Sequence, residues 1–202
     1  MKKRIGVLLS GRGSNFEALA DSVAAGRIPE AEIAIVVANR EGTQGIERAQ
    51  SRGIAARVIP SKGLEREIYD RQVVAVLREY QVDLVCLAGY MRLLSPYFVE
   101  CFPQRILNIH PSLLPAFPGL EAWKQALDYG VKVTGCTVHF VDQGVDSGPI
   151  IAQETVPILP EDTPATLHER IQHAEQWLYP LCIGLVAEQK IVIKGRQTVW
   201  LR

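Results

Sequence analysis

The sequence predicts an α/β fold with a mainly parallel sheet, and two observations support this prediction. Short apolar runs rich in Val and Ile alternate with longer segments whose apolar residues recur at helical spacing, which is typical of successive βα units. The chain has 202 residues, of which 48% are hydrophobic. A chain of this size buries one core well but is too short for two full domains. We therefore expect a single domain over residues 1–202.

The first half of the chain is expected to form a doubly wound, Rossmann-like arrangement. The apolar runs predict the strands RIGVLL from Arg4, AEIAIVVA from Ala31, ARVIP from Ala56, VDLVCLAG from Val82 and RILNIH from Arg105. The longer amphipathic segments between or after them predict helices from about Ser14, Gln44, Leu64 and Leu120. Parallel strands need crossover connections, which are usually helices, so this alternation predicts one parallel sheet.

The second half is expected to add antiparallel strands and a long C-terminal helix. KVTGCTVHFV, from Lys132, and PIIAQETVPI, from Pro149, are separated only by a loop, so we expect them to pair as a hairpin. Thr163 is a suitable N-cap, and Pro164 suits the first helical position. The apolar residues that follow at helical spacing predict a long helix in the segment that ends near Lys190.

Composition argues against several classes of protein. Lys plus Arg and Asp plus Glu number 22 each, so no basic field is available to bind nucleic acid or an anionic membrane. The first apolar run is too short for a signal peptide or a membrane span, which predicts a cytoplasmic protein. The cysteines lack the close spacing of a zinc or redox site. We expect no metal site and ordinary buried thiols at Cys86, Cys101, Cys136 and Cys182.

An anion site is predicted at the turn after the first strand, in VLLSGRGSNFEALAD. Ser14 and Asn15 stand in the first turn of the following helix, where free backbone N–H groups and the helix dipole attract a phosphate or carboxylate. Gly11 and Gly13 permit the close approach of such a ligand. The alternative is that the glycines only form a tight βα turn.

Two better-known phosphate motifs do not fit this turn. Phe16 stands where a dinucleotide fingerprint requires its third glycine, and the second strand ends in Asn39 and Arg40 instead of a ribose-binding acid. No Gly-Lys-Ser/Thr follows the turn, which excludes a P-loop. We therefore favour a monophosphate site.

A polar pair is predicted at the end of the RILNIH strand. Asn108 and His110 are two residues apart and point to the same side. An Asn amide and a switchable His together can hold a developing oxyanion and move its proton. The alternative is that they only satisfy loop carbonyls, but Pro111, Pro115 and Pro118 stiffen the loop that follows and favour a built site.

The loop in HFVDQGVDSGPI offers this pair an acid. Asp142 and Asp146 lie there among Gly144 and Gly148. A carboxylate beside His110 would favour the protonated imidazole, which can then donate a proton at neutral pH. The alternative for either Asp is a solvated turn.

Four stretches, LLSGRGSNFEAL, LAGYMRLLSP, LNIHPSLLPAFPG and VHFVDQGVDSGPI, resemble the motifs of the phosphoribosylglycinamide formyltransferases in register over nearly the whole chain. The pieces NIHPSLLP and DxGxDxGPI are shared by the wider superfamily that uses formyltetrahydrofolate, whereas SGRGSN is the narrower signal. Methionyl-tRNA formyltransferases lack that start and add a C-terminal domain, and formyltetrahydrofolate deformylases usually carry an additional N-terminal domain. The resemblance implies formyl transfer from 10-formyltetrahydrofolate to 5-phosphoribosylglycinamide in purine synthesis, without a metal.

The resemblance also implies roles for individual residues. Asn108, His110 and Asp146 would be the catalytic trio, and about 106–202 the catalytic and folate-binding half. The half at about 1–105 would bind the phosphate through the loop Gly11, Arg12, Gly13, Ser14 and Asn15, while Glu175 would hold the ribose hydroxyls. Folate-binding residues would be Arg66, Met91, Arg92, Leu93, Leu94, Val141, Asp142, Gly144 and Val145.

Some of these assignments have simpler alternatives. Glu175 lies on a largely apolar helix, where a buried carboxylate needs a partner, but it could also be an exposed acid. Met91 could be core filler instead of pocket wall. Glu121 and Trp123 stand where many relatives have histidines, and Arg12 fills a variable position.

The sequence leaves three functions to weigh. The first is direct formyl transfer, with Asn108 and His110 stabilising the oxyanion and Asp146 keeping the imidazole charged. The second is a 10-formyltetrahydrofolate hydrolase, which would not need the phosphate loop. The third is a non-catalytic nucleotide- or folate-binding module, which would gain little from a proton-transfer group. The chain is expected to act as a monomer or a homodimer on small molecules.

Overall fold

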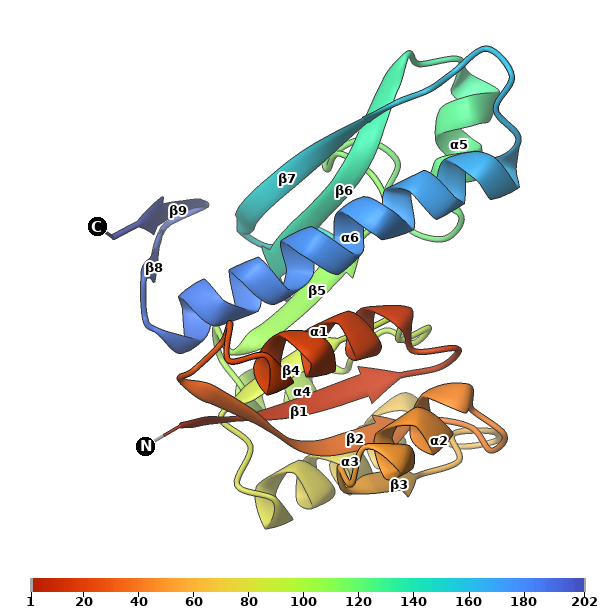
Figure 1. Ribbon diagram of the computed structural model, residues 1–202. Coiled ribbons are helices and arrows are strands. Elements are labelled where there is room, and N and C mark those ends of the chain that lie inside the picture. Colours follow the sequence, from red (N-terminus) through yellow and green to blue (C-terminus); the bar gives the residue numbers. More distant parts are fainter. Residues whose placement is uncertain (1, 202) are drawn as a thin grey trace.

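A seven-stranded sheet forms the centre of the molecule (Figure 1). The computed structural model describes residues 2–201. The strand order is β3-β2-β1-β4-β5-β6-β7, and β8 and β9 form a separate hairpin. The strands are β1 (Lys3–Leu9), β2 (Ala31–Ala38), β3 (Ala56–Val58), β4 (Leu84–Leu87), β5 (Ile106–His110), β6 (Val133–Phe140), β7 (Ile150–Pro157), β8 (Ile191–Lys194) and β9 (Gln197–Trp200).

The sheet changes direction at β5, as the sequence predicts. Strands β1 to β5 pair in parallel, whereas β6 pairs antiparallel with both β5 and β7. The register of β5 against β6 places Asn108 opposite His139 and His110 opposite Thr137. The carboxyl end of β5 therefore lies between β4 and the strand that leads into the Asp142–Ser147 loop.

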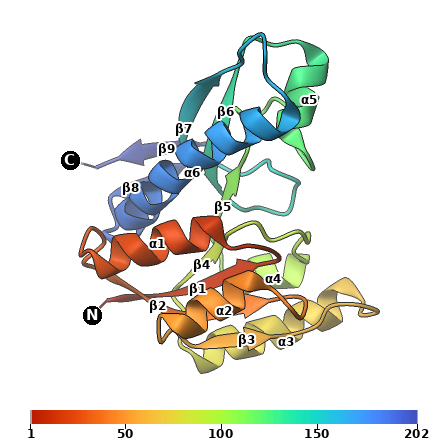
Figure 2. The same cartoon turned by 45° about the vertical axis from the view of Figure 1, so that its right-hand side comes forward.

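Helices cover both faces of the sheet, which confirms the doubly wound prediction (Figure 2). Core side chains from α1, α2 and α6 pack on one face, and those from α3 and α4 pack on the other. The helices are α1 (Ser14–Ala24), α2 (Gln44–Ser51), α3 (Arg66–Glu79), α4 (Pro96–Cys101), α5 (Ala122–Tyr129) and α6 (Pro164–Ala187).

One buried side chain of the long helix α6 contacts the backbones of β4 and β5. The hydroxyl of Tyr179 lies 3.0 Å from the carbonyl oxygen of Leu87 and 2.9 Å from that of Leu107. These two strands, β4 and β5, are the ones whose ends carry the predicted site. Thr163 caps α6 through the amide of Thr166, with Pro164 in the first turn, as predicted. None of the helices among residues 2–201 is long and apolar enough to span a membrane.

Several details differ from the sequence predictions. Helix α4 and the β8–β9 hairpin were not predicted, because both are short and packing supports them more than pattern does. Helix α6 ends at Ala187, and α3 and α5 begin two residues later than expected, at Arg66 and Ala122. Cys101 is only partly buried, which corrects the prediction of four buried thiols, although all four are free.

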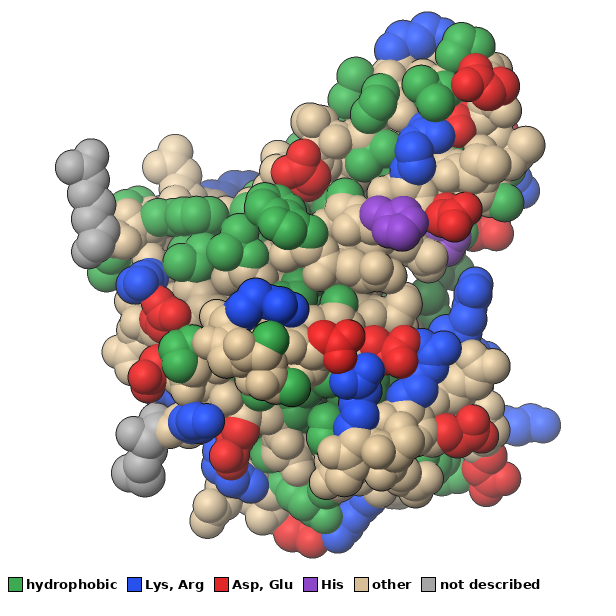
Figure 3. Space-filling model, viewed as in Figure 1, with side chains coloured by type: hydrophobic (Ala, Val, Ile, Leu, Met, Phe, Trp, Pro, Cys, Tyr) green, Lys and Arg blue, Asp and Glu red, His purple; other side chains and the backbone are tan. Residues whose placement is uncertain are grey.

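The surface carries mixed charge. In Figure 3, basic and acidic side chains are interspersed over the face shown, without a large area of one sign. This distribution agrees with the equal numbers of acidic and basic residues in the chain.

Candidate active site

A cavity of about 570 Å³ opens at the carboxyl ends of β4 and β5. Three of the segments that line the cavity include the ends of β4, β5 and β6, and a fourth includes the start of α5: residues 87–94, 108–111, 139–147 and 119–123. Arg66, at the start of α3, also lines it. Ligand sites in open α/β sheets typically occur at such an edge. Asn108, His110 and Asp146 all line this cavity.

His110 and Asp146 form a buried pair. Nδ1 of His110 lies 3.3 Å from Oδ2 of Asp146, and their side chains are 5% and 15% exposed. The other ring nitrogen, Nε2, lies 2.9 Å from the carbonyl oxygen of Phe117. An acceptor therefore stands beside each ring nitrogen, so a doubly protonated imidazole can donate from both. The amide of Gly119 donates to the same Asp146 oxygen at 2.9 Å, which orients the carboxylate.

The loop after His110 is held by hydrogen bonds as well as by prolines. The hydroxyl of Thr137 on β6 donates to the carbonyl of Ser112 at 2.7 Å and accepts from the amide of Leu114 at 3.0 Å. The hydroxyl of Ser112 donates to the carbonyl of Ala116 at 2.6 Å. These bonds fix the backbone that presents Phe117 and Gly119 to the pair.

Asn108 is oriented by a second histidine that sequence reasoning missed. Nδ2 of Asn108 lies 3.2 Å from Nε2 of His139, and Nδ1 of His139 lies 2.8 Å from the carbonyl oxygen of Phe140. Burial lowers the pKa of His139 more than Asp146 and the Phe140 carbonyl raise it. The neutral ring donates to Phe140 from Nδ1, so its Nε2 accepts one Asn108 hydrogen and leaves the other free.

The signal for His139 was present in VHFVDQG but needed the strand register. Nε2 of His139 also lies 3.8 Å from Oδ1 of Asp146, so this nitrogen lies close to two members of the predicted trio, Asn108 and Asp146. Sequence separation hides this, because Asn108 and His139 are 31 residues apart and meet only through the antiparallel pairing of β5 with β6. The His139 side chain is 2% exposed.

The predicted folate residues lie on the walls of the same cavity. Met91 is 64% exposed and Leu93 51% exposed, which overturns the alternative of Met91 as core filler. The amide of Met91 donates to the hydroxyl of Ser10 at 2.9 Å, tying this segment to the end of β1. All nine residues line the cavity: Arg66, Met91, Arg92, Leu93, Leu94, Val141, Asp142, Gly144 and Val145.

The loop from Asp142 to Ser147 is organised by its own carboxylate. Oδ1 of Asp142 accepts from the amide of Gly144 at 3.0 Å and from the hydroxyl of Ser147 at 2.7 Å. These bonds use Asp142 as a structural acceptor and leave Asp146, with its left-handed backbone at φ 49°, to face His110. Asp tolerates that conformation better than most residues.

The predicted phosphate loop lies outside the cavity lining. Gly13 is the N-cap of α1 at φ 80°, and Ser14 and Asn15 begin the helix, as predicted. A Cβ at Gly13 would lie 3.0 Å from Cα of Gly45, so a side chain there would also crowd the backbone. Gly11 and the exposed Arg12 complete the turn. Backbone N–H groups at this helix start are available to an anion.

Glu175 joins this loop from α6, because Nδ2 of Asn15 donates to Oε2 of Glu175 at 2.9 Å. Glu175 is buried, which overturns the alternative of an exposed acid. Burial raises the pKa of Glu175 to about 7, and the hydrogen bond from Asn15 opposes the rise. Oδ1 of Asn15 is buried with no hydrogen-bond partner. A buried acceptor without a hydrogen-bond partner, beside a buried carboxylate, is rare in folded proteins and calls for a functional explanation.

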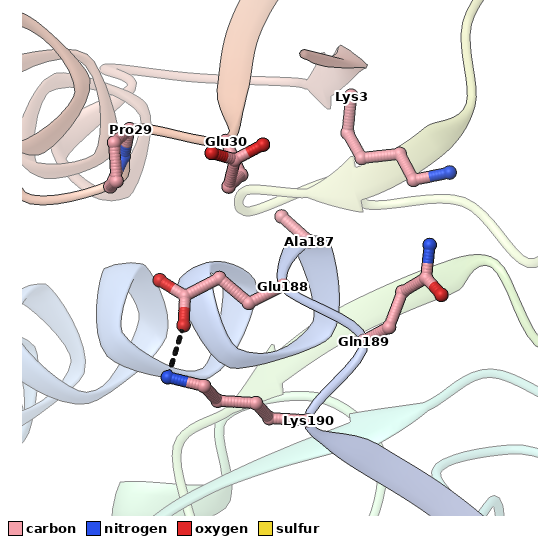
Figure 4. A pocket seen from close by; sticks show the side chains of 7 residues that line it. All are labelled: Lys3, Pro29, Glu30, Ala187, Glu188, Gln189 and Lys190. Carbon is pink, nitrogen blue, oxygen red and sulfur yellow. Dashed lines mark ion pairs between the residues drawn. The ribbon is translucent and has the colours of Figure 1, made fainter. Parts of the chain in front are cut away.

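Two further observations bear on the site. No group of three metal-binding side chains occurs among residues 2–201. A second cavity, of about 510 Å³, lies at the C-terminus of α6 and is lined by Lys3, Pro29, Glu30, Ala187, Glu188, Gln189 and Lys190 (Figure 4). Glu188 pairs there with Lys190 at 2.6 Å, and none of the predicted site residues takes part.

Comparison with known proteins identifies relatives of this chain. A model of the formyl transferase family matches residues 3–183. The phosphoribosylglycinamide formyltransferase of Escherichia coli (strain K12) is 39% identical over 196 residues, covering 96% of this chain and 92% of that protein. The crystal structure of glycinamide ribonucleotide transformylase 1 from Symbiobacterium toebii gives a TM-score of 0.97 at 50% identity, covering 100% of this chain and 95% of that one.

Longer proteins also contain a similar segment. The trifunctional purine biosynthetic protein adenosine-3 of Homo sapiens is 48% identical over 205 residues, covering 100% of this chain. The chain spans only 14% to 20% of the length of such trifunctional relatives. The family match over residues 3–183 and the near full-length alignment with the Escherichia coli protein mean that the chain belongs to the formyl transferase family, in which it is similar to the phosphoribosylglycinamide formyltransferases.

Proposed function

We propose that this chain transfers the formyl group of 10-formyltetrahydrofolate to the amino group of 5-phosphoribosylglycinamide. The products are N-formylglycinamide ribonucleotide and tetrahydrofolate, formed in the cytoplasm during de novo purine synthesis. The observation that carries the proposal is the convergence of the His110–Asp146 pair and the free Asn108 hydrogen on one cavity with an apolar wall.

The first role of these side chains would be to stabilise the oxyanion of the tetrahedral intermediate. When the substrate amine attacks the formyl carbon, negative charge develops on the formyl oxygen. The free N–H of Asn108 and Nε2–H of protonated His110 would donate to it, with the oxyanion competing with the Phe117 carbonyl for the His110 hydrogen. His139, by accepting the other Asn108 hydrogen, would keep the amide turned in the productive direction.

The proton would move without a covalent enzyme intermediate. The C–N bond to the amine forms, and the bond between the formyl carbon and N10 of the folate breaks. The attacking amine loses a proton, and N10 gains one as it leaves, so the transfer balances within the two substrates. Asp146 would keep His110 charged and position a water that carries this proton. No step requires a metal.

The acceptor would be held by a separate part of the site. The loop Gly11, Arg12, Gly13, Ser14 and Asn15 would bind its phosphate through backbone N–H groups. Glu175 and the unpartnered Oδ1 of Asn15 would receive its ribose hydroxyls. The donor's pteridine ring would lie against the wall formed by Met91 and its neighbours, and the Asp142–Ser147 loop would cover it.

The test measures, by absorbance, the formation of tetrahydrofolate from 10-formyltetrahydrofolate in the presence and in the absence of glycinamide ribonucleotide. Formation that depends on the ribonucleotide supports the transferase. Equal rates without it would make the protein a 10-formyltetrahydrofolate hydrolase. Binding of both ligands with no turnover would make it a non-catalytic module.

A further inference from the structure

Two aromatic rings stack beside the proposed acceptor site. The indole of Trp123 on α5 lies parallel to the imidazole of His168 on α6, with ring centroids 3.6 Å apart and an interplanar angle of 6°. Trp123 lines the main cavity. Figure 3 shows histidine side chains at the surface over the N-terminal half of α6. The stack therefore joins the wall of the cavity to the helix that carries Glu175.

His168 lies about two turns before Glu175 on the same face of α6, and Glu175 bonds to Asn15 of the phosphate loop. Burial lowers the pKa of His168, and the positive charge of Arg12 lowers it further. Its uncharged neighbours are Trp123 and Gln172, whose Nε2 lies 3.3 Å from Nε2 of His168. Arg12 belongs to the Gly11–Asn15 loop, so the field of a charge at that loop reaches the ring of His168. The free protein thus holds a neutral imidazole where a second cation would repel Arg12.

We propose that His168 is a further binding residue for the acceptor's phosphate, which takes up a proton from solvent when the phosphate enters beside Arg12 and then rests as a cation on Trp123. This proposal rests on the proposed function, because it uses the phosphorylated acceptor. It makes His168 a second cationic group beside Arg12 in the acceptor site, with Trp123 as the ring on which His168 stacks.

The physical reason is a change of sign in the local field. A phosphate monoester carries close to two negative charges at neutral pH, so its arrival would more than offset Arg12 and favour protonation of the ring. An imidazolium over an indole face gains a cation–π attraction that the neutral ring lacks. Gln172 can follow the change, because rotating its amide offers an oxygen to the ring and frees its N–H for the phosphate.

The fluorescence of Trp123 reports the protonation state of His168, because a protonated imidazole in contact with an indole quenches the indole's fluorescence. The chain has three tryptophans, and Trp177 and Trp200 are well exposed. Trp177→Phe with Trp200→Phe leaves Trp123 as the only emitter. Its fluorescence would be titrated from about pH 5 to about pH 8.5 in the free protein, with saturating glycinamide ribonucleotide without folate, and with ribose as the uncharged control.

The fluorescence of Trp123 is expected to fall as the pH is lowered. The pH at the midpoint of this fall should be higher by about one unit with the ribonucleotide, but not with ribose. His168→Gln should abolish the quench and raise the KM for the ribonucleotide about fivefold with kcat unchanged. His173→Gln, a matched change of an exposed histidine on the same helix, should alter neither. A midpoint unmoved by the ribonucleotide overturns the inference. If the same protein still turns over, the proposed function survives that result; if it does not, both fail.

Discussion

Glu175→Gln is expected to stabilise the protein at alkaline pH while weakening acceptor binding. The folded-state pKa of Glu175 is raised by burial from an ordinary 4.5 to about 7. Between these two values the folded state holds a proton that the unfolded state has lost, so stability falls as pH rises through this window and is level above it. A difference from 4.5 to about 7, at 1.36 kcal/mol per pH unit, corresponds to about 3 kcal/mol.

Gln has the shape of Glu and keeps an oxygen for the Asn15 amide but carries no charge to desolvate. The variant should therefore match the wild type near pH 4.5 and exceed it by up to about 3 kcal/mol at about pH 8. The KM for glycinamide ribonucleotide should rise by about ten- to a hundredfold, because a hydrogen bond to a charged group contributes roughly 1.5–3 kcal/mol.

Urea denaturation at the two pH values measures the stability difference, and initial rates measure KM. Glu169→Gln, at an exposed acid on the same helix, is the matched control and should change neither quantity. A stability difference that is the same at both pH values, or absent at the higher one, would refute the reasoning about buried charge. An unchanged KM would refute the role given to Glu175.

Substitutions at three further positions are expected to separate catalysis from binding, and a chelator tests the metal-free mechanism. Asp146→Asn should lower kcat by about a hundredfold or more while leaving the affinity for glycinamide ribonucleotide nearly intact, as calorimetry would report. His139→Ala should lower kcat about tenfold at little change in KM, and His139→Asn, which restores an acceptor for Asn108, should recover part of the loss; equal rates for both variants would argue against positioning. Gly13→Ala should raise the KM of the ribonucleotide and leave folate affinity alone, since the residue sits at φ 80° and its Cβ would crowd Gly45. Treatment with a chelator should leave turnover unchanged, and a loss restored by added metal would contradict the metal-free mechanism.

Local sequence pattern predicted the parallel part of the fold well. Buried strands such as AEIAIVVA and RILNIH are apolar runs bounded by turns, and Thr163 with Pro164 defines a helix start by local chemistry alone. The β8–β9 hairpin was invisible to this reasoning, because it depends on partners far away in the sequence. The hydroxyl of Thr198 donates to the carbonyl of Ile150 at 2.7 Å, and Nε1 of Trp200 donates to that of Ile151 at 3.2 Å.

In the candidate site too, some features can be predicted from the local sequence, and others depend on contacts between residues that are far apart in the chain. Asn108 and His110 follow from their position at a strand end, whereas the choice of Asp146 over Asp142 in the glycine-rich loop came from the family resemblance. The contact of His139 with Asn108 depends on the β5–β6 register, and the hydrogen-bond partner of Glu175 is Asn15, which lies 160 residues away. Such pairings are decided by tertiary packing, so a single sequence can suggest the groups but cannot state their distances.

The destination of the formyl carbon tests the central claim most directly. 10-Formyltetrahydrofolate labelled with ¹³C in the formyl group would be mixed with the protein and glycinamide ribonucleotide, and the carbon followed by NMR. The account predicts that the label appears in the formamide of N-formylglycinamide ribonucleotide, at the same rate at which tetrahydrofolate forms. Label that appears as free formate, at a rate unaffected by the ribonucleotide, would contradict it.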